Sequence, residues 1–161
     1  MAALLIALNG VFALSELALV SSRPARLKTL IETGRRGART ALELADNPGR
    51  FLSTVQIGIT LIGILAGAFS GAALGADLSA YLKETSLPPA LAEPVGYGVV
   101  IGLITYLSVV VGELVPKQLA LRNPEAIACV VAPIMLWLAR LGAPIVFLLD
   151  KSSRLIFFIF G

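Results

Sequence analysis

The hydrophobic positions of this chain fall into long stretches separated by short polar segments. Residues 1–22, 51–76 and 94–116 are each apolar enough and long enough to cross a hydrocarbon core of about 30 Å as an α-helix. The pattern therefore predicts an all-α integral membrane protein with three transmembrane helices, folded as a single transmembrane domain over residues 1–161.

The segment 23–50 interrupts this pattern with seven basic residues and predicts a cytoplasmic helical hairpin. Gly34 and Gly37 divide it into two short amphipathic helices, at 24–33 and 38–45. The segment is too polar to span a bilayer, so we expect it to lie at or below the membrane surface.

The distribution of basic residues predicts the orientation. Twelve of the thirteen lysines and arginines follow either the first or the third span, and the positive-inside rule places both regions in the cytoplasm. The N-terminus and a polar loop predicted at 78–93 then lie outside, in a multi-pass protein of the cell inner (plasma) membrane with a cytoplasmic C-terminus.

The last apolar stretch, 124–150, differs from the first three because it is interrupted. The interrupting residues are Pro133, Arg140 and Pro144. We predict that it forms an interfacial juxtamembrane belt helix, broken at these residues, on the cytoplasmic side. The alternative is a fourth crossing, which would export Lys151 and Arg154.

The composition supports the membrane class and narrows the chemistry. Of the 161 residues, 57% are hydrophobic and 14% are charged, against about a quarter charged in average soluble domains. Cys129 is the single cysteine, and there is no histidine. A disulfide within the chain is therefore excluded, and imidazole-ligated metal sites and Ser–His hydrolysis are disfavoured. We expect no enzyme and no nucleic-acid partner, and the lipid bilayer as the surroundings.

The third span ends in the run Gly112-Glu113-Leu114-Val115-Pro116-Lys117, which predicts a cation site. A charge inside a span costs roughly 2.5–3.5 kcal/mol on insertion scales, so Glu113 is a functional candidate. Pro116 lacks an N–H and crowds the carbonyl four residues back, which belongs to Gly112. A free carbonyl beside a carboxylate suits a hard cation. The alternative is a helical Glu113–Lys117 ion pair, with Pro116 as a simple kink.

The other two spans carry polar side chains that can reach the same inner half of the bilayer. Ser15 and Thr60 lie at a suitable depth, at 1.5 Å per residue, and would supply neutral oxygens. Gln56 shares a helical face with Thr60 and is a weaker candidate ligand. Asn9 and Glu16 share a face of the first span and are also weaker candidates. The alternative for Glu16 is an ion pair with Lys117 or Arg23.

Three runs of the sequence resemble the membrane domain of the CNNM/CorC magnesium transporters. They are Phe12-Ala13-Leu14-Ser15-Glu16-Leu17-Ala18-Leu19, then Leu52-Ser53-Thr54-Val55-Gln56-Ile57-Gly58-Ile59-Thr60, and Gly112-Glu113-Leu114-Val115-Pro116-Lys117. The resemblance extends over essentially the whole chain, and its most specific part is the Gly-Glu-x-x-Pro-Lys run.

This resemblance implies a homodimer of three-span protomers with a juxtamembrane belt helix. It implies Mg²⁺ bound between the spans and Na⁺-coupled efflux, and a pair of cytosolic CBS domains in the full-length protein after this region. One departure affects the second span. Many relatives carry asparagines after the Gly58 position, where this chain has Ile59, Thr60 and Gly63.

Two hypotheses of different classes follow. The first is a secondary-type Mg²⁺ transporter, with Glu113 and the Gly112 carbonyl as ligands, Ser15 and Thr60 as further ligands, and Na⁺ as a possible coupling ion. The second is a membrane anchor or dimerisation scaffold that transports nothing. There, glycines four residues apart, from Gly63 to Gly75, would mediate dimerisation, and the basic hairpin would bind anionic lipid or a partner.

Overall fold

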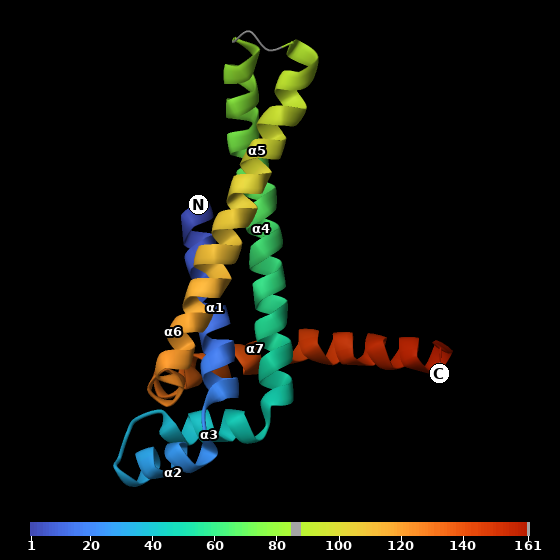
Figure 1. Ribbon diagram of the computed structural model, residues 1–161. Coiled ribbons are helices and arrows are strands. Elements are labelled where there is room, and N and C mark those ends of the chain that lie inside the picture. The colour runs from blue at the N-terminus through green and yellow to red at the C-terminus, as the bar shows by residue number, and fades with distance from the viewer. Residues whose placement is uncertain (85–87, 161) are drawn as a thin grey trace. The chain divides into compact units, whose positions relative to one another are not determined.

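The computed structural model describes residues 1–84 and 88–160, and in that part the chain is helical and has no strand. The helices are α1 (Ala2–Ser21), α2 (Pro24–Glu32), α3 (Ala38–Asp46), α4 (Pro48–Lys83), α5 (Pro89–Val109), the π-helical turn η1 (Val110–Leu114), α6 (Val115–Arg122) and α7 (Pro124–Phe160) (Figure 1). The all-α class predicted from the sequence is therefore confirmed.

Four helical stretches among the described residues are long and apolar enough to cross a membrane. They are Ala2–Ser21, Phe51–Lys83, Ala90–Arg122 and Pro124–Phe158. The first three contain the three predicted spans. The fourth contains the predicted belt, so by length and composition alone α7 qualifies as a span too.

The chain divides into two compact units, and α1 and α4 each contribute to both. The first unit comprises Met1–Leu14 and Gly58–Gln118, and the second comprises Ser15–Ile57 and Leu119–Gly161. The first unit thus holds most of the three predicted spans with the glutamate motif, and the second holds the hairpin and α7.

In the first unit, α4 and α5 form an antiparallel pair through closely packed glycines (Figure 1). A Cβ at Gly75 would crowd the Tyr97 ring, and one at Gly96 would overlap Ser79. The Ser79 hydroxyl donates to the Gly75 carbonyl at 2.6 Å. These contacts bring α4 and α5 close together next to the segment where the sequence predicted a polar loop.

The loop predicted at 78–93 is therefore wrong in extent. Helix α4 continues to Lys83 and α5 begins at Pro89, so polarity in this region marks the ends of two helices. Residues 85–87, where the loop prediction also falls, lie outside the described residues.

In the second unit, the predicted hairpin is confirmed almost to the residue. Helix α2 covers Pro24–Glu32 and α3 covers Ala38–Asp46, against 24–33 and 38–45 expected. Pro24 begins α2, where its missing N–H costs nothing. Leu27 of α2 and Ala41 of α3 are completely buried, so the apolar sides of both helices pack inward.

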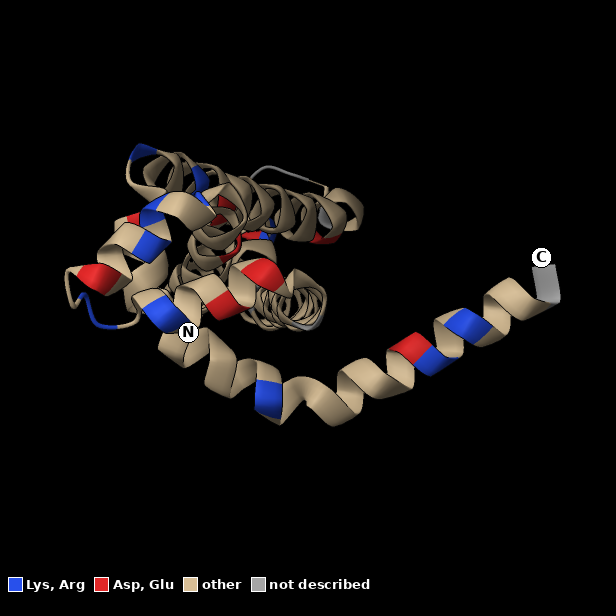
Figure 2. Cartoon of the chain, turned by 90° about the horizontal axis from the view of Figure 1, so that it is seen from below, with Lys and Arg blue, Asp and Glu red and all other residues tan. Residues whose placement is uncertain are grey.

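Helix α7 is one continuous helix, although two prolines lie inside it. Pro133 and Pro144 interrupt backbone hydrogen bonding but do not end the helix. Figure 2 shows α7 as a curved helix with long uncharged stretches. Its buried face includes Ala128, Ala132 and Met135, and it packs against α3. The expected break in this segment is thus replaced by curvature.

Candidate cation site

The glutamate motif lies in a local distortion of the helix that contains α5 and α6. Across the turn η1 (Val110–Leu114), the Val115 N–H donates to the carbonyl of Val110, five residues back instead of four. Pro116 has no N–H to donate to the Gly112 carbonyl. Such π-type turns are rare and occur frequently at functional sites. The proline therefore leaves the Gly112 oxygen available for another donor, as the sequence predicted.

That donor is Asn9 of α1. Its side-chain Nδ2 lies 3.1 Å from the Gly112 carbonyl oxygen and donates a buried hydrogen bond to it. Glycines on both sides make this approach possible. A Cβ at Gly10 would stand 3.1 Å from Cγ of Pro116, and one at Gly112 would stand 3.3 Å from the Ile6 carbonyl oxygen.

The same asparagine has a second polar atom that is buried and unsatisfied. Asn9 is 7% exposed, and its Oδ1 has no hydrogen-bond partner among the described residues. A buried acceptor left in this state costs about 1–3 kcal/mol. The Nδ2 bond to Gly112 fixes the amide orientation, so this oxygen stands beside the distorted turn. A bound cation or a water molecule would satisfy it.

Glu113, the next residue of the turn, forms an ion pair within its own helix. The Lys117 Nζ donates to Glu113 Oε1 at 2.6 Å, and the two side chains are 32% and 40% exposed. The helical pair considered from the sequence is therefore present. Both partners of this ion pair are therefore partly accessible from outside the described structure.

The remaining predicted ligands differ in their burial. Ser15 is completely buried, whereas Thr60 and Gln56 are exposed. Asn9, Thr60, Gly112 and Glu113 belong to the first unit. Within the described residues, no three Asp, Glu, His or Cys side chains cluster to hold a metal.

Glu125, which sequence reasoning did not single out, holds the second unit together. It is 5% exposed, and its Oε1 accepts a 3.2 Å hydrogen bond from the Arg23 backbone N–H. Its Oε2 lies 3.7 Å from Nη1 of Arg26. The carboxylate thus joins the start of α7 to the start of α2. An acid just after Pro124 is a helix-start signal that could have drawn attention to it.

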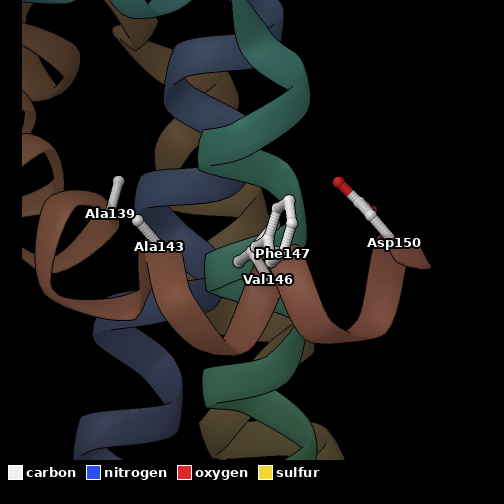
Figure 3. Close-up of a pocket in the computed structure, with 5 residues that line it drawn as sticks. All are labelled: Ala139, Ala143, Val146, Phe147 and Asp150. Carbon is white, nitrogen blue, oxygen red and sulfur yellow. The ribbon is translucent and has the colours of Figure 1, made fainter. Parts of the chain in front are cut away.

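The second unit also contains a pocket of about 270 Å³ along one face of α7 (Figure 3). It is lined by Ala139, Ala143, Val146, Phe147 and Asp150. The close-up shows Asp150 apart from the four apolar side chains. Asp150 is the only polar side chain among the described residues that line this pocket, so a cation there would meet one carboxylate and no other side-chain oxygen.

The sequence profile of the family described as the cyclin M transmembrane N-terminal domain matches residues 1–161. The UPF0053 protein sll0260 of Synechocystis is 51% identical over 98% of this chain, and the UPF0053 protein YhdP of Bacillus subtilis is 33% identical over 99%. A protein of Haemophilus influenzae named polyamine export protein is 29% identical over 97% of the chain.

The chain spans only about a third of the length of these relatives. It covers 35% of the Synechocystis protein and 36% of each of the other two. The match therefore concerns one membrane domain of longer proteins.

Proposed function

This chain belongs to the cyclin M transmembrane N-terminal domain family, and on that premise we propose that it carries Mg²⁺ across the membrane through a site at the η1 turn. The observation that supports the proposal most is the buried, unpartnered Oδ1 of Asn9. It lies in a side chain bonded to the Gly112 carbonyl, next in sequence to Glu113. A carboxylate, a carbonyl and an amide oxygen are hard ligands of the kind Mg²⁺ prefers.

The proposed site would be only partly made of protein. Mg²⁺ takes about six oxygens in octahedral geometry and usually keeps several waters. Asn9, Gly112 and Glu113 supply three kinds of oxygen, and Ser15 and Thr60 remain the predicted sources of further neutral ones. Waters would complete the shell. Glu16 and Gln56 remain weaker predicted ligands.

Lys117 would occupy the carboxylate when no ion is bound. Its ammonium group already lies 2.6 Å from Glu113 Oε1. An arriving cation would displace the ammonium group. A helical ion pair of this kind contributes only about 0.3–0.5 kcal/mol to stability, so the exchange would cost little free energy. Lys117 would thus keep Glu113 neutralised between transport events.

The proposed assembly is a homodimer of three-span protomers in the cell inner membrane, with Na⁺-coupled efflux as a secondary-type transporter. Gly63 and Gly67 support a close helix contact, because a Cβ at either would meet nothing within 4 Å in the described part of the chain. Four-residue spacing of small residues permits such contact between membrane helices. In this arrangement α7 lies at the cytoplasmic interface as the belt.

Calorimetry of the purified domain with Mg²⁺, Ca²⁺ and Na⁺ tests the proposal directly. We expect saturable Mg²⁺ binding and, in proteoliposomes, Mg²⁺ flux that responds to a Na⁺ gradient. A domain that folds and dimerises but binds no divalent cation would be the scaffold of the second hypothesis.

A second candidate is the export of polyamines. Two observations favour it: one relative carries that name, and Glu113 already binds an ammonium group, that of Lys117. Adding spermidine during the Mg²⁺ titration separates the two. Spermidine that binds more tightly than Mg²⁺ and is itself transported would make polyamines the substrate.

A further inference from the structure

The loop between α2 and α3, residues 33–37, is held in one backbone conformation. The Arg35 N–H donates to the Leu30 carbonyl at 2.9 Å, and the Gly34 N–H donates to the Ile31 carbonyl at 3.0 Å. These two bonds, with Gly34 at φ +76°, are those of a Schellman helix C-cap. The direction in which the chain leaves α2 is therefore fixed locally.

Helix α7 fixes the other end of this loop. Gly37 has φ +79°, and a Cβ there would overlap the Cys129 carbonyl of α7. Only glycine permits so close a contact in this conformation. The two arginines between the glycines, Arg35 and Arg36, are thus presented from a fixed loop beside α7.

A groove of about 760 Å³ opens between this loop and α7. Its polar side is made by Thr33, Arg35 and Arg36, and its apolar side includes Val130 and Pro133. We call it the hairpin groove. None of the described residues that line it is acidic. An adjoining pocket of about 540 Å³ shares Leu30 and Arg35 and contains Arg26, whose charge is offset by the buried Glu125 at 3.7 Å.

The apolar side of the hairpin groove continues as an exposed stripe along α7. Its members recur every three or four residues and are between 54% and 64% exposed: Val130, Ile134, Trp137, Leu141, Ile145 and Leu148. A stripe of this size facing outward marks a membrane or partner contact. A tryptophan within it is typical of the membrane interface. The groove therefore places the guanidinium groups of two arginines next to an apolar surface suited to acyl chains.

We propose that the hairpin groove binds the phosphate of an anionic phospholipid, whose acyl chains lie along the apolar stripe of α7. Guanidinium groups form paired hydrogen bonds with phosphate oxygens, and the Thr33 hydroxyl adds a donor. This inference rests on the interfacial placement of α7 proposed above, and does not depend on which ion is transported. The bound lipid would tie the hairpin and α7 to the charged leaflet.

The test is native mass spectrometry of the full-length protein, released from nanodiscs that contain phosphatidylglycerol and phosphatidylcholine. The double variant Arg35→Gln/Arg36→Gln removes the groove cations. The matched control Lys28→Gln/Arg39→Gln removes the same charge from exposed positions of the same hairpin that do not line the groove. A third variant, Arg35→Lys/Arg36→Lys, keeps the charge but loses the paired geometry.

We expect the wild type to retain phosphatidylglycerol preferentially, and the groove variant to lose roughly tenfold or more of that preference, as the loss of paired, charge-assisted hydrogen bonds to the phosphate implies. The control should keep most of it, and the lysine variant should fall between. Circular dichroism checks that all variants are folded.

Two results would overturn the proposal. An equal loss in the control variant would mean that the hairpin attracts anionic lipid by total charge alone. Binding of inorganic phosphate in detergent that matches phosphatidylglycerol and is lost with Arg35 and Arg36 would make the groove a site for soluble anions. Retention is measured without Mg²⁺, so a domain that fails to bind Mg²⁺ but keeps its lipid preference would refute transport and leave this inference intact.

Discussion

Glu113 forms an ion pair with a lysine one helical turn away, so a cation that binds this carboxylate must compete with Lys117. At the residue scale, Lys117 and a bound cation would be alternative partners of the same carboxylate. Because Glu113 is 40% exposed, the pair is screened and contributes little to stability. The two residues should therefore respond in opposite ways to substitution.

The first prediction compares Glu113→Gln with Lys117→Gln in Mg²⁺ titrations. Loss of a charged ligand costs about 1.5–3 kcal/mol, so Glu113→Gln should weaken binding roughly ten- to hundredfold. Lys117→Gln removes the competing ammonium and should leave affinity unchanged or about twofold tighter. If both variants bind like the wild type, Glu113 is not a ligand.

The second prediction concerns the unsatisfied oxygen of Asn9. Asn9→Leu keeps the approximate size and removes that oxygen, so Mg²⁺ affinity should fall about tenfold, the contribution of one hydrogen bond or ion contact to a charged group. The melting temperature without Mg²⁺ should change little, because the lost Gly112 bond is offset by removal of a buried unpaired acceptor.

Thr105→Val is the matched control, since Thr105 is an exposed polar residue of α5 in the same unit. It should leave Mg²⁺ affinity unaltered. A large drop in stability of Asn9→Leu with intact affinity would assign Asn9 a purely structural role.

At the scale of the element, η1 combines a proline with a helix that does not end. The sequence predicted that Pro116 would free the Gly112 carbonyl, and the bond from Asn9 Nδ2 at 3.1 Å confirms this. The helix nevertheless continues through α6 to Arg122, because one five-residue turn absorbs the missing hydrogen bond.

Pro116→Ala should restore an N–H that competes with Asn9 for the Gly112 carbonyl. We expect a folded protein whose Mg²⁺ affinity is lower by about tenfold, the effect of one displaced ligand bond. Isothermal titration and circular dichroism measure the two properties. Pro94→Ala is the control, because Pro94 lies inside α5 whereas Pro116 lies in α6. This variant should bind Mg²⁺ normally. Normal binding by Pro116→Ala as well would leave the proline a role in helix geometry only.

At the scale of the whole molecule, the open choice is between three and four crossings. Length and composition allow α7 to cross, whereas the charges at Lys151 and Arg154 favour the interface. The structure adds a relevant feature: α7 packs on α3 of the polar hairpin and buries Ala132 and Met135, while the stripe from Val130 to Leu148 is exposed. A helix that packs on a polar hairpin on one side and exposes apolar side chains on the other suits a position at the membrane interface.

Cysteine labelling in intact cells tests this topology, after Cys129 is replaced by alanine. A cysteine at Arg36 or Lys151 should react only after the membrane is made permeable, and one at Lys83 should react from outside. The cysteine-free protein provides the background. Reaction of a cysteine at Lys151 from outside would make α7 a fourth span and would contradict its placement as an interfacial belt.

The sequence by itself determined the helical membrane class, the bounds of the α2–α3 hairpin and the missing hydrogen bond from Pro116 to the Gly112 carbonyl. Each of these depends on local composition: apolar length, glycine spacing and a missing N–H act within a few residues of the chain. The ion-pair partner of Glu113 was also among the sequence alternatives, because it lies one helical turn away.

Only the tertiary structure decided that Asn9 of α1 bonds to Gly112, 103 residues later in the chain, and that Glu125 joins α7 to α2. The sequence places Asn9 on a face with Glu16 but holds no information on which distant carbonyl will receive its amide. Likewise, most of the segment predicted as a loop at 78–93 is helical, and α4 and α5 are in close contact at Gly75 and Gly96 on either side of it. Such pairings depend on the approach of separate helices, which packing decides.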